Sequence, residues 1–297
     1  MKNYSFFLIA CFFSFIFPIN ANPPVRSEFT FMFITDVHLQ PEQKASEAFK
    51  KVMGAANRLA PAFIINGGDI VFDAMDVPTE RATSLFDLYN KETGFLKSPI
   101  YNTIGNHDVF GIKKTSGVDP SHEFYGKKMY IEKVSRRYYS FEYGGWHFFV
   151  LDAIALNNNS YYGSIDEEQL NWIKGELKTM LPAKPIAIVS HLPFRTLYKQ
   201  EYKTNMQGND STLMVVNANE VLNVFKNNNL KLVLQGHLHY YEDLYVSGIR
   251  YITGGAVSGN WWNGPINNIK EGYTVIQIKD EEITAKYVEY GWTAIKK

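Results

Sequence analysis

The sequence is almost free of cysteine. Cys11 is the only cysteine among 297 residues, and it lies in an apolar stretch at the N-terminus. Once that stretch is removed, the mature chain can form no disulfide bond and can supply no thiolate to a metal ion. Any metal site must therefore be built from imidazole, carboxylate and amide groups.

The sequence also has no excess of charge. Lys+Arg and Asp+Glu number 30 each, the formal net charge is +0, and no long run of either sign occurs. This composition argues against binding of a nucleic acid polymer or an anionic membrane surface. Internal repeats and low-complexity linkers are absent as well. With 45% hydrophobic and 15% aromatic residues, we expect a globular chain that buries a large core.

The N-terminus has the pattern of an export signal. Lys2 precedes an apolar run from 6 to 17, and Ala21 follows shortly after. We expect residues 1–21 to be a signal peptide and 22–297 to form one exported domain, periplasmic or secreted, with no membrane span. Two alternatives stay open: an uncleaved anchor, and lipid attachment at Cys11, because LIAC (8–11) resembles a bacterial lipidation box. The sequence leaves the oligomeric state undetermined.

Strand-like and helix-like segments alternate along the chain. Strands are predicted over 29–36, 62–69, 100–108, 185–191 and 230–239, with further β segments over 244–253 and 273–289 and a hairpin around Gly144 and Gly145. Helices are predicted over 45–59, 79–93 and 217–227, and a capping-box pattern of Ser164 and Glu167 predicts another helix start. The pattern indicates an α/β fold (α+β in some schemes), with two packed mixed sheets flanked by helices in a four-layer α/β/β/α sandwich.

Each predicted strand ends in polar residues that can bind metals. The tips are Asp36-Val37-His38, Gly67-Gly68-Asp69, Gly105-Asn106-His107-Asp108, His191 and Gly236-His237-Leu238-His239. Ligands in open α/β sheets gather outside the carboxyl ends of the strands, so these tips are expected to meet. Five of the seven histidines fall in them. We therefore predict a metal site.

The residue types favour zinc, iron or manganese, because carboxylate and imidazole groups suit these ions. In an extended segment, residues two apart point to the same side, so Asp36 with His38, and His237 with His239, can reach one cavity. Seven candidate ligands are too many for one tetrahedral ion. Two divalent ions about 3.5–4 Å apart that share a carboxylate account for the number.

The ordered motifs D-x-H, G-D, G-N-H-D, H and G-H-x-H, from Asp36 to His239, resemble those of the calcineurin-like metallophosphoesterase superfamily. The resemblance implies one ion bound by Asp36, His38, Asp69 and His239, and a second bound by Asp69, Asn106, His191 and His237. It also implies that Asp69 bridges the ions and that His107 protonates the leaving group. A small phosphate monoester or diester is the implied substrate.

Two departures from the family pattern are visible. Phosphoprotein phosphatases carry an aspartate three residues after the bridging one, whereas this sequence has Phe72 there and Asp73 one place later. Whether Asp73 orients His107 is therefore open. A tyrosine typical of purple acid phosphatases is missing near Phe72, which disfavours that subfamily.

Function and substrate contacts allow alternatives. The chain can also be a catalytically silent, metal-dependent binding scaffold, or a dinuclear hydrolase of a non-phosphate bond. Candidate substrate or supporting residues are Arg195, Asp108, Asp73, Trp261 and Trp262, each with a purely structural alternative. The segments 110–137 and 254–265 are candidates for covering the site.

Overall fold

The computed structural model describes residues 28–202 and 211–295. The predicted signal peptide and Cys11 lie outside these ranges. Among the described residues, no helix has the length and apolar character needed to cross a membrane.

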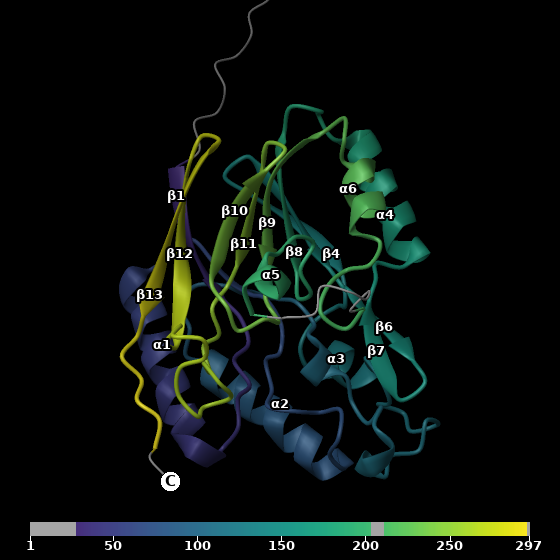
Figure 1. The fold of residues 1–297 in the computed structure, drawn as a ribbon, viewed down its shortest axis with the longest axis vertical. Helices are drawn as coiled ribbons and strands as arrows, with labels where there is room; N and C mark the ends of the chain where they lie inside the picture. The colour runs from purple at the N-terminus through teal and green to yellow at the C-terminus, as the bar shows by residue number, and fades with distance from the viewer. Residues whose placement is uncertain (1–27, 203–210, 296–297) are drawn as a thin grey trace, which may run out of the picture.

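Two mixed sheets occupy the centre of the molecule (Figure 1). The five-stranded sheet has the order β13-β12-β1-β2-β3 and consists of β1 (Glu28–Ile34), β2 (Ile64–Asn66), β3 (Ile100–Asn102), β12 (Gly272–Lys279) and β13 (Glu282–Glu289). The six-stranded sheet has the order β10-β11-β9-β8-β5-β4 and consists of β4 (Tyr139–Tyr143), β5 (Trp146–Leu151), β8 (Pro185–Ser190), β9 (Asn229–Gln235), β10 (Glu242–Val246) and β11 (Ile249–Thr253).

Each sheet contains a parallel core. Strands β1, β2 and β3 run parallel, and so do β5, β8, β9 and β11. The loops that follow parallel strands leave a sheet at the same end, which brings distant sequence segments together. The polar tips follow β1, β2, β3, β8 and β9 in this way.

An aromatic core fills the space between the sheets. Alternate residues of β1, Phe29, Phe31 and Phe33, are buried there with residues of the opposite sheet such as Phe148. Phe31 stacks on Phe63 at 4.9 Å between ring centroids. The period of two along β1 sends its other buried side chains to the opposite face of the sheet.

Helices cover the outer faces of both sheets (Figure 1). Helices α1 (Ala45–Leu59), α2 (Thr79–Thr93) and α3 (Lys128–Lys133) lie with the five-stranded sheet, and α4 (Glu167–Thr179) and α6 (Ala218–Val224) with the six-stranded sheet. On that side, Phe149 of β5 contacts Trp172 of α4 and Phe225, which follows α6. The predicted four-layer sandwich is confirmed.

Several shorter elements were not expected from the sequence. They are helix α3, the hairpin of β6 (Ile154–Asn157) and β7 (Ser160–Gly163), the short helix α5 (Tyr198–Tyr202) and three 3-10 helices, Glu42–Lys44, Asn106–Asp108 and Lys114–Ser116. The predicted capping box is wrong. Helix α4 is capped by Asp166, whose side chain accepts a hydrogen bond from the Gln169 backbone at 2.9 Å, while the Ser164 hydroxyl lies 3.3 Å from Asn217.

Candidate metal centre

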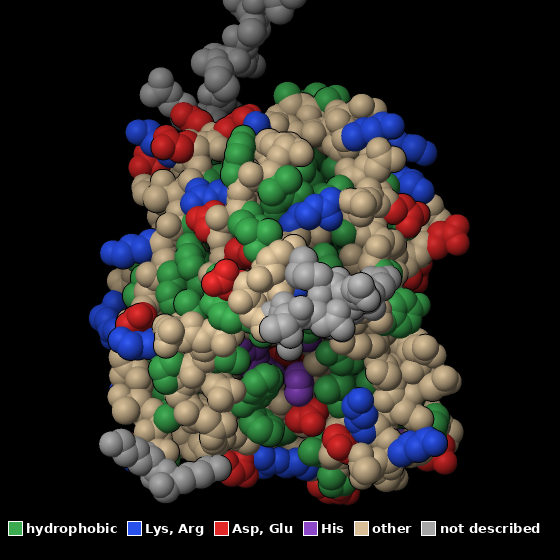
Figure 2. Space-filling model, in the orientation of Figure 1, with side chains coloured by type: hydrophobic (Ala, Val, Ile, Leu, Met, Phe, Trp, Pro, Cys, Tyr) green, Lys and Arg blue, Asp and Glu red, His purple; other side chains and the backbone are tan. Residues whose placement is uncertain are grey.

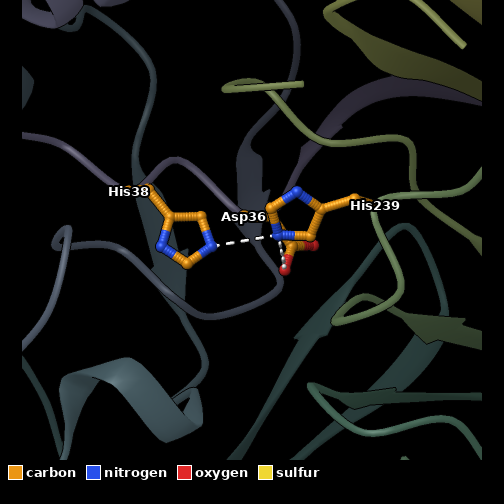
Figure 3. Close-up of side chains that lie close together, drawn as sticks. All are labelled: Asp36, His38 and His239. Carbon is orange, nitrogen blue, oxygen red and sulfur yellow. Dashed lines mark hydrogen bonds and ion pairs between the residues drawn. The ribbon is translucent and has the colours of Figure 1, made fainter. Parts of the chain in front are cut away.

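The polar tips meet in three overlapping groups of side chains that could bind a metal ion, and one of them, His38, Asp69 and His107, shares a member with each of the other two. Asp36, His38 and His239 form one group, which we call the first triad, and their ligand atoms lie within 4.8 Å of one another. Figure 3 shows these three side chains pointing toward one another. Asp69, His191 and His237 form the second triad under the same limit. Figure 2 shows histidine side chains at the bottom of a hollow in the surface, so the centre is open to solvent on one side.

The first triad is tightly packed and buried. The Nε2 atoms of His38 and His239 are 3.0 Å apart, and the Asp36 Oδ1 atom lies 3.4 Å from Nε2 of His239. All three side chains are at most 2% exposed.

One carboxylate oxygen connects the two triads. The Oδ2 atom of Asp69 lies 3.2 Å from Nε2 of His191 and 3.6 Å from Nε2 of His38. The amide oxygen of Asn106 lies 3.2 Å from the same His191 nitrogen. The ring of His237 lies 5.2 Å from that of His191. The structure thus brings all seven candidate ligands into one cluster, with Asp69 between its halves.

The backbone reaches this arrangement by left-handed turns, which corrects the expectation of extended segments. Strand β1 ends at Ile34 and β9 at Gln235. Positive φ angles, from 46° to 74°, occur at Asp36, His38, Asp69, His237 and His239. Such conformations cost non-glycine residues about 1–3 kcal/mol each and persist only where the surrounding structure enforces them. The side chains converge because the loops turn, and strand alternation has no part in it.

Two glycines are required by close approach of neighbouring groups. A Cβ atom on Gly105 would lie 2.2 Å from the backbone nitrogen and Oδ1 of Asp69. Gly68 has a φ of +103°, and a Cβ there would lie 2.6 Å from Nδ1 of His191. A side chain at either position would displace a candidate ligand.

The donor set fits a cation. The Nδ1 atoms of His38 and His239 face the carbonyl oxygens of Phe72 and Gly259, at 3.2 and 2.5 Å. A carbonyl only accepts, so each Nδ1 carries a ring hydrogen, and in the neutral form of each ring Nε2 presents a lone pair. The two lone pairs therefore face each other across 3.0 Å beside the Asp36 carboxylate. Acceptors that converge without a hydrogen between them are stabilised by a metal ion.

The pKa values of His38, His237 and Asp69 suit metal binding, whereas that of His191 does not. Burial lowers the pKa of His38 well below its usual range, and burial together with His191 lowers the pKa of His237 to about 3. Neutral imidazole is the form that binds metals. Burial opposes ionisation of Asp69, but the imidazoles of His191, His107 and His38 outweigh it and lower the pKa of Asp69 well below its usual range. Burial lowers the pKa of His191, but the charge of Asp69 outweighs this effect and raises it to about 9, so His191 must release a proton to bind an ion.

His107 lies at the rim of the cluster. Its side chain is 23% exposed, and its ring centroid is 4.8 Å from that of His38. The carboxylate of Asp73 lies 3.5 Å from Nδ1 of His107, at ion-pair distance. Burial of the ring lowers the pKa of His107, but the charges of Asp69 and Asp73 outweigh this effect, so the pKa is raised. Asp73 thus lies at ion-pair distance from His107 although it comes one place later than the family pattern, but it forms no hydrogen bond with Nδ1.

Asp108 supports the loops rather than a substrate. Its fully buried carboxylate accepts hydrogen bonds from the backbone nitrogens of Ile70, Val71 and Gly105, at 2.9, 3.2 and 2.8 Å. Burial and the charge of Asp69 raise the pKa of Asp108 to about 7, against the opposing effect of the backbone donors. Asp108 therefore ties the loop of Asp69 to the loop of Asn106.

The Arg195 side chain is held by hydrogen bonds to neighbouring protein groups. Its guanidinium donates to the Phe194 carbonyl at 2.8 Å and to the amide oxygen of Asn219 in α6 at 2.5 Å. These contacts favour the structural alternative for Arg195 over a contact with substrate.

The loop of residues 256–262, which we call the clamp loop, holds the first triad from behind. The Ser258 hydroxyl donates to the Asp36 carbonyl at 2.8 Å, and the Gly259 carbonyl accepts from Nδ1 of His239. The indole nitrogen of Trp262 donates to the His38 carbonyl at 2.7 Å. One segment thus contacts every member of the first triad. The sequence motifs do not predict these contacts, because each of them uses a backbone carbonyl.

The two neighbouring tryptophans have different places. Trp262 is 1% exposed and packs at a right angle against Trp292. Trp261 is 36% exposed, and its ring centroid lies 4.3 Å from that of His239 and 5.7 Å from that of His38. The structural alternative therefore describes Trp262, whereas Trp261 borders the candidate site.

Comparisons with known proteins agree with this arrangement. The family model for calcineurin-like phosphoesterases matches residues 29–241. A search of curated protein sequences finds no match. Similar solved structures include a dimetal phosphatase from Danio rerio (15% identity, TM-score 0.60, covering 89% of this chain and 100% of that one) and the GAP50 anchor of the inner membrane complex of Plasmodium (17%, 0.54, 91% and 90%).

A third similar structure is the purple acid phosphatase PPD1 from yellow lupin seeds, at 14% identity and a TM-score of 0.56, covering 89% of this chain and 52% of that one. At these identities the three structures establish the shared fold alone. The family model, in contrast, covers well over half of the chain and spans every candidate ligand. The chain therefore belongs to the calcineurin-like phosphoesterase family.

Proposed function

We propose that this protein is an exported, dinuclear metal-dependent hydrolase of phosphate esters. The observation that carries the proposal is the position of Asp69 Oδ2, within 3.6 Å of a histidine nitrogen of each half of the cluster. One oxygen in that position is able to bridge two cations. Asp36, His38 and His239 would hold one ion, and Asn106, His191 and His237 the other.

Two divalent cations bound there, of iron, manganese or zinc, would supply a water nucleophile at neutral pH and positive charge for the phosphoryl oxygens. The chain itself must supply a proton to the departing oxygen. The position of His107 supports this role, because its ring lies at the rim against His38 and is partly exposed. With Asp73 next to Nδ1, the Nε2 atom is left to face a substrate.

The experiment is the substitution His107→Ala in protein loaded with Mn²⁺, Fe²⁺ or Zn²⁺. General acid catalysis contributes about 10²–10⁴ in rate. We expect the variant to keep both ions by elemental analysis and to lose turnover by this factor on alkyl phosphates. The loss on p-nitrophenyl phosphate and bis-p-nitrophenyl phosphate should be smaller, because nitrophenolate leaves without a proton. An equal loss on both kinds of ester would rule out the acid role.

The alternative of a silent binding scaffold deserves the same test. One structural neighbour is described as an anchor, although that description belongs to the Plasmodium protein alone. A scaffold has no need of a proton donor beside its ions. Wild-type protein that binds two ions but hydrolyses neither nitrophenyl ester nor a cyclic nucleotide would favour the scaffold, or a hydrolase of another bond.

Export is supported by the N-terminal pattern of Lys2, the apolar run and Ala21. Expression of the full chain in a bacterial host and N-terminal sequencing of the periplasmic fraction test this part. Cleavage after Ala21 is expected. A mature chain that begins at a lipid-modified Cys11 would instead indicate a protein anchored to a membrane by its lipid.

A further inference from the structure

Trp261 is placed to contact the organic part of a substrate. Its indole ring lies 4.3 Å from the ring of His239, tilted by 34°, so one face is covered by a member of the first triad. The side chain nevertheless remains 36% exposed, unlike its neighbour Trp262 at 1%. A large aromatic side chain is thus held at the mouth of the cluster with part of its surface open to a ligand.

The backbone maintains this placement at a cost. Both Trp261 and Trp262 have positive φ angles, of 46° and 67°. For bulky residues this conformation is a genuine outlier, which requires enforcement by the surrounding structure. The indole of Trp262, which is buried and donates to the His38 carbonyl at 2.7 Å, contributes to that enforcement.

Trp261 and the candidate acid His107 flank the same imidazole. Their ring centroids lie 5.7 and 4.8 Å from that of His38. A group bonded to an oxygen that His107 protonates begins beside His38, whose ring also neighbours Trp261, so a flat ring on that group would extend toward Trp261. The contact therefore concerns the leaving group rather than the phosphoryl group.

We infer that Trp261 is a specificity-determining platform, and that the preferred substrates are phosphate esters whose leaving group carries a flat aromatic ring. The inference rests on the proposed function, because it assumes that phosphoryl groups bind over the metal ions. Stacking on an aromatic side chain is tolerant of the identity of the ring, since every such ring has a π-face. The class therefore includes aryl, benzyl-like and nucleobase-bearing esters.

The test uses phosphonates that cannot be hydrolysed, titrated calorimetrically into metal-loaded protein. Benzylphosphonate places a flat ring where an aryl ester has one, ethylphosphonate lacks the ring, and cyclohexylmethylphosphonate replaces it by a non-planar apolar group. For wild-type protein we expect benzylphosphonate to bind about tenfold more tightly than either of the others. Trp261→Leu should remove this preference and leave ethylphosphonate binding unchanged, while Trp261→Phe should keep most of it.

Tyr245 offers a matched control, because it is an aromatic side chain that is 76% exposed near the turn of the β10–β11 hairpin. Tyr245→Leu should leave all three affinities unchanged. The inference is overturned if wild-type protein shows no preference for the flat ring, or if Trp261→Leu weakens all three ligands equally. Failure of the proposed function looks different, because then wild-type protein with two bound ions would bind none of the phosphonates.

Discussion

The two halves of the metal cluster are supported in different ways. The first triad is backed by a single segment, the clamp loop, which contacts Asp36, His38 and His239 through Ser258, Trp262 and Gly259. The second triad is backed by loops that directly follow the core strands. There, Nδ1 of His191 donates to the Gly67 carbonyl at 2.8 Å, and the His107 backbone donates to Asp69 Oδ1 at 2.8 Å.

Because of this difference, the geometry of the second triad and the affinity of the first triad for its ion should depend on different parts of the molecule. The supports of the second triad are part of the sheet ends, so its geometry depends on the stability of the fold. The support of the first triad comes from a loop that follows β11, after the last ligand in the chain. Groups behind metal ligands commonly change metal affinity by about 10- to 100-fold. We therefore expect the clamp loop to tune the first ion independently of the second.

The largest effect is expected at Asp69, the carboxylate that connects the two halves of the cluster. Asp69→Asn replaces the shared anionic oxygen with a neutral amide, so both ions should bind more weakly. The loss of affinity should exceed about 100-fold, which is the upper end of what a group behind a metal ligand contributes. Elemental analysis after dialysis should show the metal content falling from two per chain toward none. Full occupancy in this variant would refute the bridging role.

A suitable control for that variant is Asp87→Asn. Asp87 is 60% exposed and pairs with Lys133 at 2.8 Å on the surface. The same chemical change there should leave the metal content at two.

A smaller effect, stronger for the second ion than for the first, is expected for Asp108→Asn. The amide group offers only one oxygen for the three backbone donors of Ile70, Val71 and Gly105 and turns its own N–H groups toward one of them. An unsatisfied buried donor costs about 1–3 kcal/mol. Urea denaturation of the metal-free protein should show this loss of stability, and titration should show the second ion weakened more than the first. Equal weakening of both ions would contradict the division of the site.

The smallest effect is expected in the first triad, for loss of the hydrogen bond between Trp262 and the His38 carbonyl. Trp262→Phe keeps the aromatic packing against Trp292 but removes the hydrogen bond to the His38 carbonyl. We expect about a tenfold loss of affinity for one ion and no change for the other, measured by metal titration. Trp146→Phe is the control, since Trp146 is also buried and donates to a carbonyl, that of Asp280 at 3.1 Å, far from the cluster in the fold. If both substitutions act alike, the clamp loop has no special role.

The architecture could be predicted from the sequence where hydrophobic patterns are strong. Helix α2 lies over the predicted residues 79–93, and the Gly144-Gly145 hairpin forms with both glycines at positive φ. Local signals were less reliable where several polar residues compete. Asp166 caps α4 in place of Ser164, because the Ser164 hydroxyl is directed to Asn217, a residue 53 places away that the local pattern does not include.

The sequence by itself determined which ligand types a metal site in this protein can use. Its motifs from Asp36 to His239 carry the family resemblance, and the near absence of cysteine leaves carboxylate, imidazole and amide as the only ligand types. Only the tertiary structure decided which way the two tryptophans face, and that one loop supports the first triad. The physical reason is that each of these contacts joins a side chain to the backbone carbonyl of another segment, such as Nδ1 of His239 to the Gly259 carbonyl, and a carbonyl is present at every position of a sequence.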